Sequence, residues 1–440
     1  MVLTGLAVGN VLGGIAADRG RGSLAFSFGF AGAWSVIPIV ADRLPEVLLP
    51  SLGFVWGALA SAATYFLVPA MSMGAVTPLL VARQTNSVTE VGLRFGHVGA
   101  AGTTGAILGS VVTGFAALPA FSLGPTLSLI SAFFFLCAAF AATLERSRVP
   151  APLFVLFAGT ALLLPRAAED EDIVFSGQSV YASLRVVDNE WYGDVPVREL
   201  WQNGSLSSAE HRETGEPTQY YKRTEAWLLS DRLDRIDSVL VLGGAANTLP
   251  ARLKRWQPDL HITVVEIDPM AVEVAREYFS FGRLEPGSVE VRVGDARPYL
   301  RQEERRYDVI LADAYDHLYS VPWPLVTREA FASMEGRLKE GGMMALTLST
   351  PLTGPGSRFL ERVVATLRTV FRDVRVYLTR SDLDATSTQE VIVVAVRDPG
   401  DFPEVASPWI DVPGIGTPLR DDYAPVEFLQ ALQFVHDPAW

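Results

Sequence analysis

Four apolar runs in the second half of the chain end either in a glycine pair or in a carboxylate. In chain order, the residues at these ends are Gly243 with Gly244, Glu266, Asp295, and Asp313 with Asp316. If the runs are parallel strands of one sheet, their carboxyl ends meet at one edge, where open α/β sheets bind their ligands. A solvated loop would explain any single acid, but four successive strand ends of this kind predict a shared binding site.

The glycine pair lies in the stretch VLVLGGAANTLPARL, residues 239–253, which predicts a strand, a tight turn and a helix. A turn without bulky side chains lets the backbone approach a ligand, and the amino terminus of the helix supplies unpaired N–H groups. Glu266 ends the next apolar run, where a carboxylate can accept hydrogen bonds from two ribose hydroxyls. The pattern therefore predicts one nucleoside-binding half of a doubly wound sheet.

These residues can meet at one edge only if their strands belong to one sheet. After Glu169 the chain alternates between strand and helix patterns. The predicted strands are residues 238–242, 261–266, 289–293, 307–312, 342–348, 373–378 and 390–396. This alternation predicts a parallel sheet with helices on both faces and an antiparallel pair at its end.

Two flanking segments have other patterns. Residues 173–206 alternate in hydropathy and predict an antiparallel β unit. Its expected turn residues are Gly177, Asn189, Gly193 and the pair Asn203-Gly204. Residues 399–440 are rich in proline and predict an irregular tail folded over the sheet.

The first part of the chain has a different composition. Residues 1–148 carry seven arginines and five acidic residues, a net charge of +2. The whole chain carries −13, so residues 149–440 carry −15. The apolar stretches are residues 1–17, 23–40, 52–82, 97–118, 121–144 and 151–164. The middle four reach or approach the ~20 residues that a helix needs to cross a bilayer. We expect about six segments, most of them inserted in a membrane, with close packing at glycine-rich faces such as Gly5, Gly9, Gly13 and Gly14, or Gly99, Gly102, Gly105 and Gly109.

The arginines predict an orientation for this membrane part. The arginine-bearing loops 18–22, 83–96 and 145–148 fall on one side if every segment crosses, and the positive-inside rule makes that side cytoplasmic. Residues 151–164 form a short segment, a length at which interfacial or re-entrant placement is common. The hypothesis is therefore a multi-pass protein of the cell membrane with a cytoplasmic α/β domain.

Several motifs give the chain a specific resemblance. GGAANTL, VVEIDP, VGDAR and YDVILADAYD followed by VPWPLVTREAF resemble the spermidine synthase (polyamine aminopropyltransferase) family. GLAVGNVLGGIAADR, AMSMGAVTPLLVAR and LRDDYAPVEFL resemble its membrane-embedded branch, whose first transmembrane helix has no counterpart ahead of Met1. The resemblance implies an α-helical transmembrane bundle followed by a Rossmann-like domain of the class I methyltransferase type. The implied parts are residues 1–165 (transmembrane), 169–225 (β-hairpin unit), 226–398 (catalytic domain) and 399–440 (tail).

The resemblance also implies roles for individual residues. Decarboxylated S-adenosylmethionine, or S-adenosylmethionine itself, would be the donor, and an amine would be the acceptor. The implied donor-binding residues are Gly243, Gly244, Ala245, Glu266, Asp295 and Ala296, and the implied catalytic acids are Asp313, as general base, and Asp316. The implied acceptor-binding residues are Tyr220, Tyr221 and Glu225, although core packing explains each tyrosine equally well. An amine must lose a proton before it attacks the carbon beside a sulfonium, and a carboxylate in reach can accept that proton.

Four positions depart from the family's pattern. Ala246 replaces an acid of the glycine-rich turn, and Asn247 replaces a glycine but can still adopt a positive φ. Ala182 replaces the glutamine of a Tyr-Gln pair, and Thr224 replaces the histidine of a Tyr-His-Glu motif. These changes fall on the amine half of the site and leave two alternatives open, a methyltransferase and a non-catalytic nucleoside-binding membrane module.

Other classes of function lack a sequence signal. The five histidines show no ligand spacing with acids or with Cys137, so we expect no metal site. The chain has no nucleophile-elbow or phosphate-loop motif, and its acidic charge opposes nucleic-acid binding. The DRGRG loop at residues 18–22 leaves transport as a minor alternative. The expected partners are an amine substrate, the lipid bilayer and, by the resemblance, a second copy in a homodimer.

Overall fold

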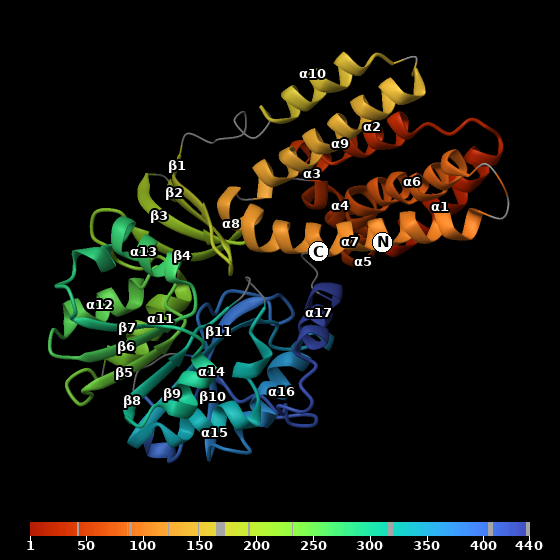
Figure 1. Cartoon of the computed structure of the whole chain (residues 1–440). Coiled ribbons are helices and arrows are strands. Elements are labelled where there is room, and N and C mark those ends of the chain that lie inside the picture. The colour runs from red at the N-terminus through yellow and green to blue at the C-terminus, as the bar shows by residue number, and fades with distance from the viewer. Residues whose placement is uncertain are drawn as a thin grey trace. The chain divides into compact units, whose positions relative to one another are not determined.

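The computed structural model describes residues 1–41, 44–85, 87, 90–121, 123–147, 149–163, 172–191, 194–230, 232–315, 320–403 and 408–436. The chain forms two compact units, Met1–Glu171 and Asp172–Trp440 (Figure 1). The first consists of helices, and the second contains both sheets and the remaining helices.

The helices of the first unit coincide with the predicted apolar stretches. They are α1 (Val2–Asp18), α2 (Leu24–Trp34), α3 (Ile37–Val40), α4 (Leu44–Leu52), α5 (Phe54–Ala62), α6 (Val68–Gln84), α7 (Val91–Val112), α8 (Leu118–Phe121), α9 (Leu123–Glu145) and α10 (Ala151–Ala161). Two π-helical turns, Ala63–Leu67 and Thr113–Ala117, make α5 continuous with α6 and α7 continuous with α8. Helix α4 is the exception, because most of it lies between the predicted stretches 23–40 and 52–82.

Three helices in the described part of the chain are long and apolar enough to cross a membrane. They are Phe54–Gln84, Val91–Ala117 and Leu123–Glu145. The stretch at residues 23–40, expected as a fourth span, is divided into α2 and α3 and is shorter.

Glycine permits the close approach of α1 to α6. A Cβ atom on Gly5 would lie 2.6 Å from the carbonyl oxygen of Leu67, and one on Gly13 would lie 2.6 Å from the Cα of Ala75. The prediction of close packing therefore holds for this face of α1. It is wrong for Gly14 and for the glycines of α7, because a Cβ on any of these has no described atom within 4 Å.

One ion-paired cluster joins three chain segments at one end of the helical unit. The carboxylate of Glu145, at the end of α9, lies 2.7 Å from a guanidinium nitrogen of Arg83. It also accepts hydrogen bonds from the Oγ of Ser23 and the N–H of Leu24, at the start of α2. Arg83 donates to the carbonyl of Gly22. The loop at residues 18–22 therefore shares one end of the bundle with the starts of the other two arginine-bearing loops, as the sequence predicts.

The second unit begins with a four-stranded antiparallel sheet. Its strands are β1 (Ile173–Gln178), β2 (Ser183–Trp191), β3 (Val195–Gln202) and β4 (Ser205–His211), paired in chain order. Asn203 and Gly204 form the β3–β4 turn with positive φ angles, as predicted. Gly177 and Asn189 lie inside strands, so their assignment to turns was wrong, and Gly193 lies outside the described residues.

The second sheet has eight strands in the order β12-β10-β11-β9-β8-β5-β6-β7 (Figure 1). The strands are β5 (Ser238–Leu242), β6 (His261–Glu266), β7 (Val289–Val293), β8 (Tyr307–Ala312), β9 (Leu338–Thr350), β10 (Asp373–Leu378), β11 (Gln389–Val396) and β12 (Trp409–Ile410). The five strands from β9 to β7 are parallel, and β11, β10 and β12 continue the sheet antiparallel. This is the predicted Rossmann-like arrangement with an antiparallel end.

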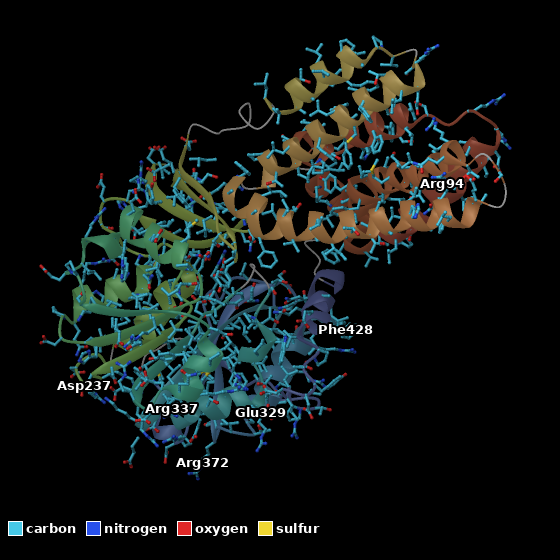
Figure 2. The ribbon with its side chains drawn as sticks, in the orientation of Figure 1. Arg94, Asp237, Glu329, Arg337, Arg372 and Phe428 are labelled. Atoms are coloured by element: carbon cyan, nitrogen blue, oxygen red, sulfur yellow. The ribbon has the colours of Figure 1, made fainter. Side chains whose placement is uncertain are left out.

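Helices cover both faces of this sheet because alternate strand residues face opposite sides. Leu240 and Leu242 pack with residues of α14 (Ala296–Gln302), α15 (Arg328–Gly336) and α16 (Arg358–Leu367). Val239 and Val241 pack instead with residues of α11 (Tyr220–Ser230), α12 (Thr248–Trp256) and α13 (Pro269–Tyr278). Charged side chains such as Asp237 and Arg372 lie on the outside of the unit (Figure 2).

The C-terminal tail has more structure than the sequence predicts. Residues Trp409–Ile410 add the edge strand β12, and Val426–His436 form helix α17, which packs against α16. Asp421 fixes the segment between them, because its carboxylate accepts hydrogen bonds from Arg297 at 2.6 and 2.8 Å and from the Oγ1 of Thr327 at 2.6 Å.

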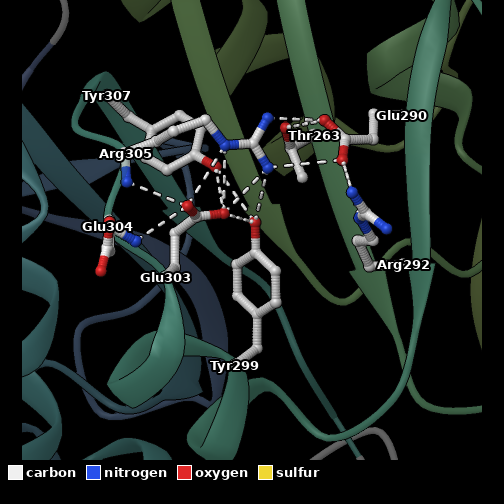
Figure 3. A network of polar contacts seen from close by, with 8 residues as sticks. All are labelled: Thr263, Glu290, Arg292, Tyr299, Glu303, Glu304, Arg305 and Tyr307. Atoms are coloured by element: carbon white, nitrogen blue, oxygen red, sulfur yellow. Dashed lines mark hydrogen bonds and ion pairs between the residues drawn. The ribbon is translucent and has the colours of Figure 1, made fainter.

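A polar network fixes the far end of α14, whose first residues lie at the sheet edge (Figure 3). Arg305 forms ion pairs with Glu303 at 2.8 Å and with Glu290 at 2.7 Å. The hydroxyls of Tyr299 and Tyr307 lie 3.1 Å apart beside Glu303. The network ties the end of α14 to β7, which precedes the helix in the chain, and to β8, which follows it.

Candidate active site

The five-residue turn after β5 has a backbone that only small residues tolerate. Gly243, Ala245 and Asn247 have φ angles of 89°, 44° and 54°. A Cβ on Gly243 would lie 2.5 Å from the carbonyl oxygen of Asp313, so this position requires glycine. Asn247 adopts the positive φ predicted for it, and Ala245 adopts one too, which is uncommon for a residue with a Cβ and is typical of functional turns.

Glu266 holds this turn in place. Its Oε2 accepts hydrogen bonds from the N–H groups of Gly244 at 2.8 Å and Ala245 at 2.9 Å. Its Oε1 accepts one from the N–H of Asp268 at 3.0 Å. The sequence predicts ribose hydroxyls as the partners of this carboxylate, whereas the described contacts are with backbone. Each carboxylate oxygen can accept more than one hydrogen bond, so the two roles are compatible.

A cavity of about 260 Å³ lies at the carboxyl edge of the large sheet. The predicted site residues that line it are Tyr221, Gly243, Ala245, Glu266, Asp295, Ala296 and Asp313. The cavity is also lined by Tyr181 and Ala182, in the loop between β1 and β2, and by Pro322 and Pro324 after β8. Residues from four strand ends that are far apart in sequence therefore surround one space.

Three predicted site residues do not line this cavity, and a fourth lies outside the residues that the structure describes. Gly244 belongs to the turn but does not line the cavity, and its N–H donates to Glu266. Tyr220 was expected to form a wall for the acceptor, but its side chain is 44% exposed and lies under the guanidinium of Arg380. Glu225 is buried behind the cavity wall. Asp316 falls within residues 316–319, outside the described residues.

The structure adds a residue that the sequence reasoning missed, Lys222. Its side chain is buried, and its ammonium contacts Oδ2 of Asp313 and lies 3.5 Å from Oε2 of Glu225. Glu225 also accepts a hydrogen bond from Thr347 at 2.7 Å. The lysine occurs three residues before Glu225 in the chain, which places both on one face of α11, but nothing in the sequence places that face against Asp313.

Glu390 is the second missed residue, and it lines the cavity from the start of β11. It is paired across the ladder with Ser349, which lines the cavity from β9 together with Thr347. The sequence stretch TSTQEVIVVAV shows only one acid before an apolar run, so its position at the site depends on the antiparallel hairpin.

Burial dominates the electrostatics of these acids. It raises the pKa of Glu225 to about 7, against the opposing effect of Lys222, and the negative charge of Asp313 adds to the rise. Burial, with the charges of Asp313 and Glu225, raises the pKa of Glu390 to about 7. The pKa of Asp313 is also raised by burial, and Lys222 opposes this rise. Burial alone would lower the pKa of Lys222, but the two carboxylates hold it above its usual value. The ammonium of Lys222 is thus charged at neutral pH.

The arrangement has two chemical halves. One half presents a tight turn of small residues, an acid-capped helix start at Asp295 and a carboxylate at Glu266, which suits a nucleoside. The other half presents Asp313 and Glu390, which suit cationic groups or the transfer of a proton. Among the described residues there is no group of histidines, cysteines or acids suited to a metal ion.

Comparison with known proteins finds similar sequences. Residues 229–381 match the spermine/spermidine synthase domain. The chain is 29% identical over 221 residues to a probable polyamine aminopropyl transferase of Bifidobacterium longum (strain NCC 2705), a match that covers 49% of this chain and 47% of that protein. It is 28% identical over 229 residues to a polyamine aminopropyltransferase of Vibrio vulnificus (strain CMCP6), covering 50% of this chain and 72% of the relative.

Solved structures also match. A crystal structure of a probable spermidine synthase from Corynebacterium glutamicum ATCC 13032 is 17% identical, with a TM-score of 0.46, and the match covers 60% of this chain and 94% of that one. This chain spans about half the length of the Bifidobacterium relative.

Proposed function

We propose that this chain, whose residues 229–381 match the spermine/spermidine synthase domain, transfers an aminopropyl group from decarboxylated S-adenosylmethionine to an amine acceptor. The observation that carries the proposal is that Glu266, beside the glycine turn, and Asp313 line the same cavity. A donor nucleoside and an acceptor amine would meet in that cavity.

The proposed reaction is a displacement at carbon. The neutral nitrogen of the acceptor attacks the methylene carbon of the aminopropyl group that is bound to sulfur. The new C–N bond forms as the C–S bond breaks, and the sulfur leaves as the neutral thioether of methylthioadenosine. The proton released from the nitrogen passes to the carboxylate of Asp313, which lies at the cavity wall.

Donor binding is assigned to the turn and the next two strand ends. Glu266 would accept the ribose hydroxyls while it keeps its bonds to Gly244 and Ala245. Asp295 and Ala296, at the start of α14, would border the adenine, and the network at the other end of α14 would keep this helix start in position.

The helical unit would anchor this enzyme in a membrane. Three helices have the required length and composition, and the cluster of Arg83 with Glu145 supports a shared end for the arginine-bearing loops. By the positive-inside rule that end is cytoplasmic. Helix α10 has 11 residues, about 16 Å, which is too short to cross a hydrocarbon core of ~30 Å. We therefore assign the α/β unit to the cytoplasmic side of the cell membrane.

The test uses the purified full chain in detergent, supplied with decarboxylated or intact S-adenosylmethionine and with a series of amines. We expect aminopropyl transfer, detected as methylthioadenosine and an extended amine. Asp313→Asn should lower kcat by ~10²–10⁴-fold, the usual contribution of a positioned base, and should leave donor affinity within a few-fold of the parent. Asp234→Asn, at an exposed carboxylate, is the matched control.

Two results would reject the proposal. Methyl transfer from intact S-adenosylmethionine without aminopropyl transfer would make the chain a methyltransferase. Donor binding without transfer to any amine would make it a nucleoside-binding module, and the replacements at Ala182, Thr224 and Ala246 would then be the reason.

A further inference from the structure

The carboxylate of Glu390 is without a counter-ion in the part of the chain that the structure describes. Glu390 lines the cavity, is largely buried and is influenced by the charges of Asp313, Glu225 and Lys222. Among the described residues, none donates a hydrogen bond to its carboxylate oxygens. A carboxylate in such a place is stabilised when a cation binds beside it.

Asp313 is in the opposite situation. The ammonium of Lys222 contacts its Oδ2, and the side chains of both residues are less than 10% exposed. Lys222 lies behind the cavity wall and leaves Asp313 facing the cavity. Of the two acids that line the amine half of the cavity, Asp313 therefore has a cation beside it, whereas no ammonium or guanidinium of the described residues forms an ion pair with Glu390.

This difference between Asp313 and Glu390 suits a diamine, whose two nitrogens must be in different protonation states when it reacts. The reacting nitrogen has to be neutral when it attacks, and a carboxylate whose charge is already compensated holds an ammonium less strongly. The other nitrogen stays protonated at neutral pH and needs an anionic partner.

The strand geometry gives the two carboxylates a suitable spacing. Asp313 directly follows β8 and Glu390 lies on β11, with β9 between them. From the strand spacing and the register, their Cα atoms lie roughly 12 Å apart. Thr347 and Ser349 of β9 line the cavity between them. A short diamine can extend along this floor from one carboxylate to the other.

We propose that Glu390 is the specificity-determining residue of the acceptor site, where it binds the non-reacting ammonium of an α,ω-diamine while the reacting nitrogen faces Asp313. This inference rests on the proposed function, because it takes Asp313 as the place of reaction.

The experiment compares 1,4-diaminobutane with 1-aminobutane, which lacks the second nitrogen. Binding of each to the full chain, saturated with methylthioadenosine, is measured by calorimetry for the parent, for Glu390→Gln and for Glu340→Gln. Glu340 is an exposed glutamate on β9 that does not line the cavity, so it controls for the same chemical change.

We expect the parent to bind the diamine at least tenfold more tightly than the monoamine. Glu390→Gln should remove this preference without changing monoamine affinity, and Glu390→Asp should keep part of it. Equal affinity of the parent for the two amines would overturn the inference, as would a full diamine preference in Glu390→Gln.

Turnover assays separate this inference from the proposed function. Aminopropyl transfer with an unchanged KM for the diamine in Glu390→Gln would refute the role of Glu390 and leave the proposed function intact. Diamine binding that depends on Glu390, without any transfer, would support the amine site and reject the transferase.

Discussion

Removal of Lys222 should destabilise the α/β unit more at alkaline than at acidic pH. Lys222→Met replaces a buried ammonium by an apolar side chain of similar length. Asp313 and Glu225 both lose their shared cation, and both lie in surroundings that disfavour a carboxylate charge.

The magnitude follows from burial. The side chains of Lys222 and Asp313 are 7% and 9% exposed, so they form a buried pair. Loss of one partner of a buried pair costs about 3–5 kcal/mol when the other remains charged. The pKa of Glu225 is raised from 4.5 to about 7. A carboxyl with a raised pKa contributes stability below its unfolded value, and that contribution is lost as the pH rises through the folded value. The deficit of Lys222→Met should thus be small at pH 5 and reach about 3–5 kcal/mol at pH 8.

Urea unfolding followed by tryptophan fluorescence measures this effect. Seven of the nine tryptophans lie in residues 172–440, so the signal reports mainly on the α/β unit. The matched control is Lys339→Met. Lys339 forms an ion pair with Asp308 at 2.7 Å, but its side chain is 36% exposed. We expect a loss of less than about 1 kcal/mol for it. The double variant Lys222→Met with Asp313→Asn should regain part of the loss.

The reasoning is refuted if Lys222→Met is no less stable than the Lys339→Met control at pH 8. A deficit that is the same at pH 5 and pH 8 would also refute it, because the loss would then come from packing alone.

Three further predictions concern ligands and topology. Glu266→Ala should weaken donor binding by about 2–3 kcal/mol, since it removes a charged acceptor and also releases the turn at Gly244; unchanged affinity by calorimetry would reject the ribose assignment. Diamine affinity should rise as the pH increases through about 7, because Glu390 ionises there beside Asp313, Glu225 and Lys222, and a flat profile from pH 6 to 8 would contradict this. Asp422→Cys in a Cys137→Ser background places a thiol at an exposed site of the α/β unit, and an impermeant thiol reagent should label it only after cells are opened. Ready labelling of intact cells would place this unit outside.

Local patterns were enough to predict the strands and the turn. Strands β5, β6, β7, β8 and β10 begin and end at the predicted residues. Their apolar runs are bounded by glycine and by acids, and such local signals need no distant partner. Asn247 has the positive φ expected from its residue type. The parallel arrangement of these strands then brings Gly243, Glu266, Asp295 and Asp313 to one edge.

The sequence was less informative where a structure depends on a distant partner. The tail was expected to be irregular, but Trp409 and Ile410 form a strand because β10 offers a free edge. Gly177 and Asn189 lie inside strands, since residue type alone does not fix the place of a turn.

The electrostatics of the candidate site depended on tertiary structure alone. The strand-end rule identified Asp313 from the sequence, but its partner Lys222 is on a helix 91 residues earlier in the chain. Glu390 reaches the cavity because β11 pairs antiparallel with β9, which places its first residues at the edge where parallel strands end. Types and spacings along the chain predict which residues share an edge, whereas the charge that each acid feels depends on burial and on groups brought close only by packing.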